Sequence, residues 1–215
     1  MYSNEIYTLY KELLEKYGSP EKIWPQWCAK KKTEKDRELV VIGAILTQRT
    51  SWHNAHLALE NLKKERLLSL KNIAKLPNLE KLTDLIRPAG FYQTKPKRLF
   101  ILASFIVQEY ENLDKLAKEN VKIARNKLLN LYGIGPETAD TILLYALDRP
   151  SFVIDEYTKR FVNKFFPYQK KFDYYNLKSF FEKNLPKKVE VYQNYHCLII
   201  VESKGLKGSL MKIVK

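Results

Sequence analysis

Apolar residues along this chain recur mostly at intervals of three and four positions, as they do on one face of an α-helix. Glycine and proline residues separate these runs and predict the turns between helices. No two alternating runs are joined by a hairpin signal, so we expect an all-α fold. The expected helices span residues 3–17, 37–48, 52–65, 68–75, 79–85, 95–111, 114–119, 122–131, 136–147, 155–165, 173–184 and 187–202.

The segment Arg149–Asp155 (RPSFVID) could pass for a short strand. Because Pro150 is its second residue, an extended connector is the simpler interpretation. We expect Asp155 to cap the next helix, a position in which aspartate is common. The last stretch, VESKGLKGSLMKIVK from Val201 onward, has glycines and lysines but no apolar face, and we expect a loose basic tail.

The chain is strongly basic, since 38 lysines and arginines oppose 24 aspartates and glutamates among its 215 residues, a formal net charge of +14. Such an excess favours a polyanionic partner, most often nucleic acid. The alternative is a lysine-rich surface of the kind found in heat-adapted proteins.

The two cysteines, Cys28 and Cys197, are too few for a disulfide framework. The N-terminal segment is an amphipathic helix with scattered acidic residues, and it lacks the basic start and long apolar run of a signal peptide. No apolar run approaches the roughly 18 residues that span a bilayer. We therefore expect a cytoplasmic protein without membrane contact.

A tight turn is expected within LYGIGPETAD (Leu131–Asp140), between two predicted helices. Gly133 and Gly135 can take positive φ without steric cost, and Pro136 suits the first helical position. Such a turn presents backbone N–H groups at a helix N-terminus, which favours an anion such as a DNA phosphate. The alternative is a plain turn between two helices, which is also glycine-rich.

GIG followed by Thr138 is the helix-hairpin-helix signature, and Leu131–Asp155 resembles the hairpin-plus-aspartate segment of the endonuclease III superfamily of DNA glycosylases. In that family a loop rich in glycine and proline follows the hairpin and ends at the catalytic aspartate, which here matches Asp155. The resemblance implies that Asp155 is catalytic and that Gly133, Gly135 and Thr138 contact DNA.

Two further segments extend the resemblance in the family's order. GAILTQRTSWHNA is similar to the segment whose glutamine or asparagine fills the gap left by a flipped base, and Gln48 is the matching residue. LIRPAGFYQTKPKRL is similar to the segment whose residue after the glycine wedges the opposite strand. That residue is Phe91, with Tyr92 beside it, so the resemblance implies that both contact DNA.

Family members that both excise a base and cut the strand carry a lysine in the hairpin, and this chain has Glu137 there. A carboxylate cannot form the Schiff base that β-elimination requires. The resemblance therefore implies a monofunctional, hydrolytic enzyme. In it an ionised Asp155 helps water attack or stabilises an oxocarbenium-like sugar.

No second acid is evident for the leaving base, which favours a base that leaves easily, such as a purine alkylated at N3 or N7. A pocket for such a cation needs aromatic faces. Trp24, Pro25 and Trp52 give this chain a likeness to the bacterial 3-methyladenine DNA glycosylase III subgroup, which also has glutamate in the hairpin. The alternative is that Trp24, Trp27 and Trp52 are ordinary core residues.

Basic residues follow both candidate site segments, namely Lys95, Lys97, Arg98, Lys159 and Arg160. Phosphate contacts and solvated faces are equally good interpretations of them. His53 and His56 lie one helical turn apart without a nearby carboxylate or cysteine to complete a metal site, so we interpret them as surface or DNA-facing residues.

The resemblance implies two helical lobes with a DNA-binding cleft between them. Residues 37–146 would form the lobe that ends in the hairpin, while 1–36 and 147–215 would form the other and place Asp155 at the junction. Many relatives hold a four-cysteine iron–sulfur cluster near the C-terminus. Only Cys197 lies there in this chain, so that cluster cannot form.

No cofactor is required by this interpretation, although a monovalent cation at the hairpin is compatible with it. The expected partner is double-stranded DNA containing damaged bases, bound by a nucleoid-associated monomer. The favoured hypothesis is a glycosylase for alkylated purines such as 3-methyladenine. Two alternatives stay open: a glycosylase of the same fold for an oxidised or mismatched base, and a non-catalytic DNA-binding protein.

Overall fold

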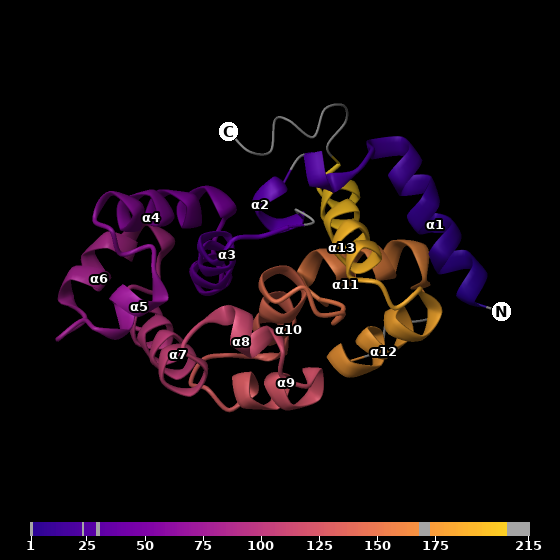
Figure 1. Ribbon diagram of the computed structural model, residues 1–215. Coiled ribbons are helices and arrows are strands. Elements are labelled where there is room, and N and C mark those ends of the chain that lie inside the picture. Colours follow the sequence, from indigo (N-terminus) through magenta and orange to yellow (C-terminus); the bar gives the residue numbers. More distant parts are fainter. Residues whose placement is uncertain (1, 23, 29–30, 168–172, 206–215) are drawn as a thin grey trace. The chain divides into compact units, whose positions relative to one another are not determined.

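The computed structural model describes residues 2–22, 24–28, 31–167 and 173–205. Every regular element in these residues is a helix, so the predicted all-α class is confirmed (Figure 1). The chain divides into two compact units. The first unit comprises Met1–Lys31 and Asp148–Lys215, and the second comprises Lys32–Leu147.

The first unit is built from the two ends of the chain. Its elements are α1 (Tyr2–Tyr17), the 3₁₀ turn η1 (Pro20–Lys22), α2 (Pro25–Cys28), α11 (Glu156–Phe165), α12 (Tyr174–Asn184) and α13 (Val189–Ser203). α13 contacts α1, η1, α2 and α11. Its residues from Tyr192 to Ile199 are all buried, as expected for a helix surrounded by others.

Aromatic rings fill the centre of the first unit. The Tyr195 ring on α13 is fully buried, and its centroid lies 5.2 Å from that of Tyr10, 6.0 Å from Phe161 and 5.8 Å from Phe181. Phe181 also stacks on Phe152 at 4.2 Å. Pairs at these distances add to the free energy gained from burying the rings. Since Phe152 lies in the connector before α11, this core fixes the segment that leads to Asp155.

The second unit holds the middle of the chain. Its elements are α3 (Glu34–Leu46), α4 (Trp52–Lys64), α5 (Leu70–Ala74), α6 (Glu80–Ile86), the 3₁₀ turn η2 (Arg87–Ala89), α7 (Lys95–Tyr110), α8 (Leu113–Ala117), α9 (Val121–Leu129), α10 (Pro136–Thr141) and the π-helical turn η3 (Ile142–Ala146). Every residue of α3 from Val40 to Leu46 is buried. α3 packs against α4, α7, α8 and η3, so it is the central helix of this unit.

The ends of α3 differ from the sequence prediction of 37–48. Thr33 and Asp36 form a capping box: the Thr33 hydroxyl accepts the Asp36 N–H at 3.3 Å, and the Asp36 carboxylate accepts the Thr33 N–H at 2.8 Å. The helix therefore begins at Glu34. It ends at Leu46, which leaves Gln48 in the turn beyond the helix rather than inside it.

Two other helices also depart from expectation. The run predicted as 136–147 is α-helical only to Thr141 and continues as a π-helix from Ile142. The tail predicted from Val201 overlaps the helix predicted for 187–202, and α13 extends to Ser203, one residue beyond that prediction. Glu202 there accepts hydrogen bonds from Lys16 at 2.8 Å and Lys164 at 3.0 Å. Residues 206–215 of that tail lie outside the described residues. The short elements η1, α2 and η2 were not predicted, because a single turn carries no periodic signal.

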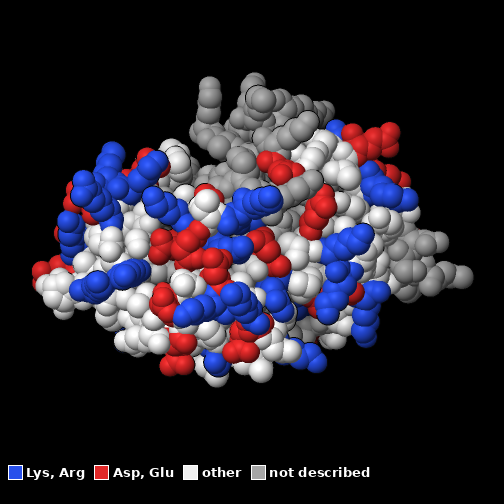
Figure 2. Space-filling model, in the orientation of Figure 1, with Lys and Arg blue, Asp and Glu red and all other residues white. Residues whose placement is uncertain are grey.

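Acidic and basic side chains are interspersed on the face of the molecule that Figure 2 shows. On that face the excess of basic residues is therefore spread out rather than gathered in one patch. Elsewhere in the structure, exposed pairs such as Arg87 with Asp84 and Lys159 with Glu156 join residues of opposite charge. Among the described residues no helix is both long enough and apolar enough to cross a bilayer.

A buried ion pair holds the two helices on either side of the hairpin turn. Arg125 on α9 donates from Nε and Nη2 to the two carboxylate oxygens of Asp140 on α10, at 2.8 and 2.9 Å. The Asp140 side chain is fully buried. Two parallel bonds to one carboxylate fix orientation as well as distance.

We expect Arg125→Met to lower the free energy of unfolding by about 3 kcal/mol, because it removes both guanidinium donors from a buried carboxylate. Urea denaturation followed by circular dichroism measures this change. The matched control is Arg87→Met, which breaks an exposed pair and should stay within about 0.5 kcal/mol of the unmodified protein. Equal effects of the two substitutions would contradict the structural role given to Arg125.

Candidate functional site

The hairpin turn lies in the second unit, between α9 and α10. Gly133 has φ +77°, in the left-handed region, as predicted. Gly135 can take that conformation too but does not: its φ is −91° and its ψ 177°, which is extended backbone at the N-cap of α10. Pro136 occupies the first helical position, as expected. The backbone therefore requires glycine at Gly133 and does not require it at Gly135.

Arg98 on α7 occupies the space beside Gly133. A Cβ added at Gly133 would lie 2.4 Å from Arg98 Nε and 2.5 Å from its Cδ and Cγ, far closer than atoms approach one another. A Cβ at Gly135 would meet no atom within 4 Å. The absence of a side chain at Gly135 leaves the N-terminus of α10 open to a ligand, while at Gly133 it makes room for Arg98.

Gln48 is bonded to this turn in the structure. Its Nε2 donates to the Gly133 carbonyl at 3.1 Å and to the Thr138 hydroxyl at 3.0 Å, and its Oε1 accepts from Arg98 Nη1 at 2.6 Å. Sequence reasoning placed Gln48, Gly133 and Thr138 on the DNA side but did not predict that they bond to one another. The structure brings them together, with Arg98 as an additional member.

Phe91 lies in a second loop of the same unit. Its side chain is 52% exposed, and its φ of +49° is a left-handed conformation that costs a non-glycine residue free energy. Gly90 before it also has positive φ, +71°. Tyr92 is exposed too, with the Arg87 guanidinium 4.7 Å from its ring centroid. A large apolar ring held out toward solvent on a strained backbone is typical of a contact surface.

Two lysines predicted to contact phosphate have other partners. Lys95 is fully buried, and its Nζ donates to the carbonyls of Leu46 and Ala89. The prediction that Lys95 is a surface phosphate contact is therefore wrong, because its ammonium is buried inside the unit and cannot reach a phosphate. Lys159 is exposed, as expected, and pairs with Glu156 at 2.7 Å.

The aromatic residues expected to form a base pocket belong to different units. Trp52 begins α4 in the second unit, is partly buried, and stacks on His56 with ring centroids 6.2 Å apart. Trp24 lies just before α2 in the first unit and is also partly buried. The side chain of Pro25 lies outside the described residues. Glu137 is exposed in the first turn of α10, where an acidic residue suits the helix dipole.

Asp155 lies in the first unit at the N-cap of α11, as predicted. Its Oδ1 accepts the Thr158 N–H at 2.7 Å, and its Oδ2 lies 3.4 Å from Nε2 of His196 on α13. The Asp155 side chain is 15% exposed and that of His196 8%. Sequence reasoning missed His196, because nothing in the local pattern of α13 indicates which distant residue its imidazole faces.

The connector before Asp155 is held by α12. Lys178 donates to the Ser151 hydroxyl at 2.7 Å and to the Phe152 carbonyl at 3.1 Å. Glu182, one turn later, accepts the Phe152 N–H at 2.9 Å. Residues Ser151–Ile154 are buried. The segment is a connector without helix or strand, as expected, and its bonded backbone sets the position of Asp155.

Asp155 is held as a carboxylate by its partners. Burial by itself would raise the pKa of Asp155, but the charge and hydrogen bond of His196 and the Thr158 N–H outweigh it, so the pKa lies below its ordinary value. A carboxylate in this setting is ionised at neutral pH and only slightly hydrated, so it can stabilise a positive charge that develops beside it.

Residues 42–187 match the family model of the HhH-GPD superfamily of base excision DNA repair proteins. The chain belongs to this superfamily. It is a DNA glycosylase of base excision repair.

Relatives of this HhH-GPD protein include a Methanocaldococcus jannaschii protein named as a candidate DNA repair glycosylase, 48% identical over 93% of this chain and 87% of that one. A solved structure of the Helicobacter pylori 3-methyladenine DNA glycosylase, bound to 1,N6-ethenoadenine, has a TM-score of 0.76 at 28% identity and covers 96% of this chain and 99% of that one. A structure of endonuclease III trapped as a covalent intermediate with DNA has a TM-score of 0.69 at 18% identity, covering 96% and 88%, and shares the fold.

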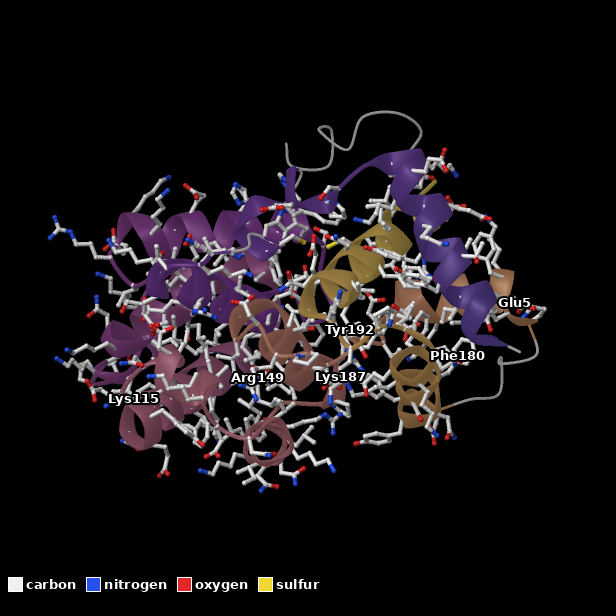
Figure 3. All side chains as sticks on the ribbon, turned by 45° about the vertical axis from the view of Figure 1, so that its right-hand side comes forward. Glu5, Lys115, Arg149, Phe180, Lys187 and Tyr192 are labelled. Carbon is white, nitrogen blue, oxygen red and sulfur yellow. The ribbon has the colours of Figure 1, made fainter. Side chains whose placement is uncertain are left out.

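Within the described residues, no three side chains of His, Cys, Asp or Glu are grouped so as to hold a metal ion. A monovalent cation at the hairpin stays a prediction. A surface depression in the first unit, lined in part by Lys187 and Tyr192 (Figure 3), contains none of the residues predicted for the site.

The two hairpin glycines of this HhH-GPD protein should respond differently to alanine. We expect Gly133→Ala to lower the free energy of unfolding by about 2 kcal/mol or more, because Cβ both forces a left-handed alanine and displaces Arg98. Gly135→Ala should cost less than about 1 kcal/mol, from a weaker cap alone. Thermal and urea denaturation measure both. Equal losses would show that Arg98 does not depend on the space at Gly133.

Replacing His196 should change how Asp155 titrates. A carboxyl whose folded-state pKa is depressed stabilises the protein above its unfolded pKa and loses that contribution as the pH falls through the folded value. His196→Gln removes the imidazole that lowers the pKa of Asp155 and leaves the burial that raises it, so we expect that pKa to rise. The protein should then be less stable at neutral pH and should lose less stability as the pH falls. Carbon-13 NMR of the Asp155 carboxyl measures the shift directly.

Cys197→Ala is the matched control for His196→Gln, since Cys197 is the next residue on α13 and is equally buried. It should leave the titration of Asp155 unchanged. An Asp155 titration that is the same in His196→Gln as in the unmodified protein would contradict the pairing.

Proposed function

We propose that this protein is a monofunctional DNA glycosylase that hydrolyses the N-glycosidic bond of alkylated purines such as 3-methyladenine. The proposal rests on one observation, that the exposed hairpin position at which lyase relatives have a lysine is Glu137. A carboxylate cannot attack the sugar C1′ to form a Schiff base, so water is left as the nucleophile.

Asp155 is the proposed catalytic residue. As the base leaves, positive charge develops on the sugar, and a poorly hydrated carboxylate stabilises that charge better than a solvated one. The contacts from Thr158 and His196 keep Asp155 ionised and oriented. Asp155 can also accept a hydrogen bond from the attacking water.

The second unit supplies the proposed DNA contacts. The first backbone N–H groups of α10 have no carbonyl one turn earlier and can bind a phosphate beside Gly135. Gln48 and Phe91 would fill the gap left by the flipped base and wedge the opposite strand, with Tyr92 beside them. Thr138 supports this surface through its bond to Gln48, and Lys159 of the first unit would contact phosphate.

The substrate follows from the chemistry that the site provides. Without a residue assigned to protonate the leaving base, a purine that already carries positive charge is favoured. Trp24, Pro25 and Trp52 are the proposed contacts of the cationic base, since an aromatic face attracts a cation by about 0.5–2 kcal/mol. Alkylation also weakens pairing, which lowers the cost of flipping. The Helicobacter pylori structure of 28% identity supports this choice, since that protein is named as a 3-methyladenine DNA glycosylase.

We expect the unmodified protein to release 3-methyladenine from DNA treated with dimethyl sulfate, measured by chromatography of the free bases. Asp155→Asn should lower the single-turnover rate at least about 100-fold, because the neutral amide no longer stabilises the developing charge. Binding of the variant to the same DNA should persist.

A panel of lesions separates the open alternatives. Release of an oxidised or mismatched base with no methylated purine would contradict the proposed substrate and select another glycosylase activity of the same fold. Full activity of Asp155→Asn would contradict the proposed mechanism. Glu156→Gln, the neighbouring exposed carboxylate, is the matched control and should keep the unmodified rate.

A further inference from the structure

A buried lysine connects the two loops that carry Gln48 and Phe91. Lys95 is the first residue of α7, and its side chain is fully buried. Its Nζ donates to the Leu46 carbonyl at 2.7 Å and to the Ala89 carbonyl at 2.8 Å. The two carbonyls belong to different elements, so one ammonium group bridges them.

Both carbonyls terminate helical elements. Leu46 is the last residue of α3, and Ala89 is the last residue of η2; both are fully buried. Carbonyls at such ends have no amide partner within their helix, and a cation is favoured beside them. Within the described residues no carboxylate forms an ion pair with Lys95, and burial lowers its pKa to about 8. These two carbonyls are therefore the main hydrogen-bond acceptors that stabilise the buried ammonium.

The chain that leaves each carbonyl leads directly to a proposed insertion residue. Gln48 is the second residue after Leu46, and Phe91 is the second residue after Ala89. Both loops contain left-handed backbone, with φ +52° at Arg49 and +49° at Phe91. Conformations of this kind persist only where the surrounding structure holds them.

Lys95 also holds the second loop through its backbone. Its N–H donates to the Phe91 carbonyl at 2.9 Å, and so does the Thr94 N–H. The Lys95 ammonium lies 5.9 Å from the centroid of the Phe91 ring. One residue therefore contacts the start of the Gln48 loop, the start of the Phe91 loop and Phe91 itself.

We propose that Lys95 is a positioning residue that fixes the Gln48 and Phe91 loops relative to each other, so that both side chains enter DNA together. The inference rests on the DNA-insertion roles proposed above for Gln48 and Phe91, but not on the identity of the excised base. Interactions that act on a flipped nucleotide tolerate displacements of only about 0.5 Å. A bridge between the loops provides that constraint before DNA arrives.

The test uses a probe that needs no excision. A DNA duplex carries 2-aminopurine opposite a tetrahydrofuran abasic analogue, and the fluorescence change on binding reports insertion next to the gap. Lys95→Met replaces the ammonium with an apolar side chain of similar length. We expect it to lose most of the fluorescence change and to bind the abasic duplex at least about tenfold more weakly. Its affinity for an undamaged duplex of the same length should change less than about threefold.

Lys118→Met is the matched control, since Lys118 is an exposed lysine of the same unit to which no DNA contact is assigned. It should keep the full fluorescence change. The double variant Gln48→Ala/Phe91→Ala calibrates the probe and should lose the change, and adding Lys95→Met to it should weaken abasic binding no further. If this double variant keeps the signal, the proposed roles of Gln48 and Phe91 fail, and the inference for Lys95 fails with them.

A Lys95→Met variant that gives the full signal would overturn the inference for Lys95 alone. So would equal losses of affinity for abasic and undamaged duplexes, because these would indicate general loss of structure. If Lys95→Met does not fold, Lys95→Arg carries the test: it keeps a charge and donors for both carbonyls on a longer arm. We expect Lys95→Arg to lose less of the fluorescence change and to weaken binding to the abasic duplex more than to the undamaged one. Equal weakening for the two duplexes would overturn the inference.

Discussion

Carbonyl groups at the ends of helices, buried away from water, are the constraint on which the second unit depends. A fold made of many short helices contains many such groups, and each one without a donor costs free energy. Long polar side chains from elsewhere in the unit supply these donors. Arg37 donates to the carbonyl of Ala146 at the end of η3 and Asn61 to that of Leu85 in the last turn of α6, while Gln48 donates to the partly buried carbonyl of Gly133 in the hairpin turn. Lys95 supplies two carbonyls at once.

The proposed DNA contacts are attached to these same helix ends. The Gln48 loop leaves the end of α3, the Phe91 loop leaves η2, and the hairpin joins α9 to α10. The hydrogen bonds that complete the fold therefore also set the positions of the groups proposed to meet DNA. The amide of Gln48 has two bonds to the hairpin and one to Arg98 on α7, so moving into a DNA gap would require it to exchange them.

Asp155 in the first unit also has two roles: it caps α11, and it is the proposed catalytic carboxylate. Its Oδ1 caps α11, while its Oδ2 faces His196. The cap fixes where the carboxylate lies, because the helix can begin only where its first N–H groups find an acceptor. The aromatic core around Phe152 and the bonds from α12 fix the chain before it.

The sequence predicted what depends on neighbouring residues. The helices followed from the spacing of apolar residues, and the cap at Asp155, the proline at the start of α10 and the positive φ of Gly133 followed from local chemistry. The prediction that Lys95 contacts phosphate was wrong because lysine is usually exposed. Only the packed structure shows that two buried carbonyls accept hydrogen bonds from its ammonium. His196 and the bonds of Gln48 were missed for the same reason, since their partners are distant in the sequence.

The central claim is that Glu137, in place of a lysine, makes this glycosylase hydrolytic. The most direct test incubates the protein with an end-labelled duplex containing a single 7-methylguanine, in the presence of sodium borohydride, and resolves the products under denaturing conditions. We expect a labelled strand of full length that carries an abasic site and breaks only after treatment with alkali. A labelled strand covalently attached to the protein, or one cut without alkali, would contradict it.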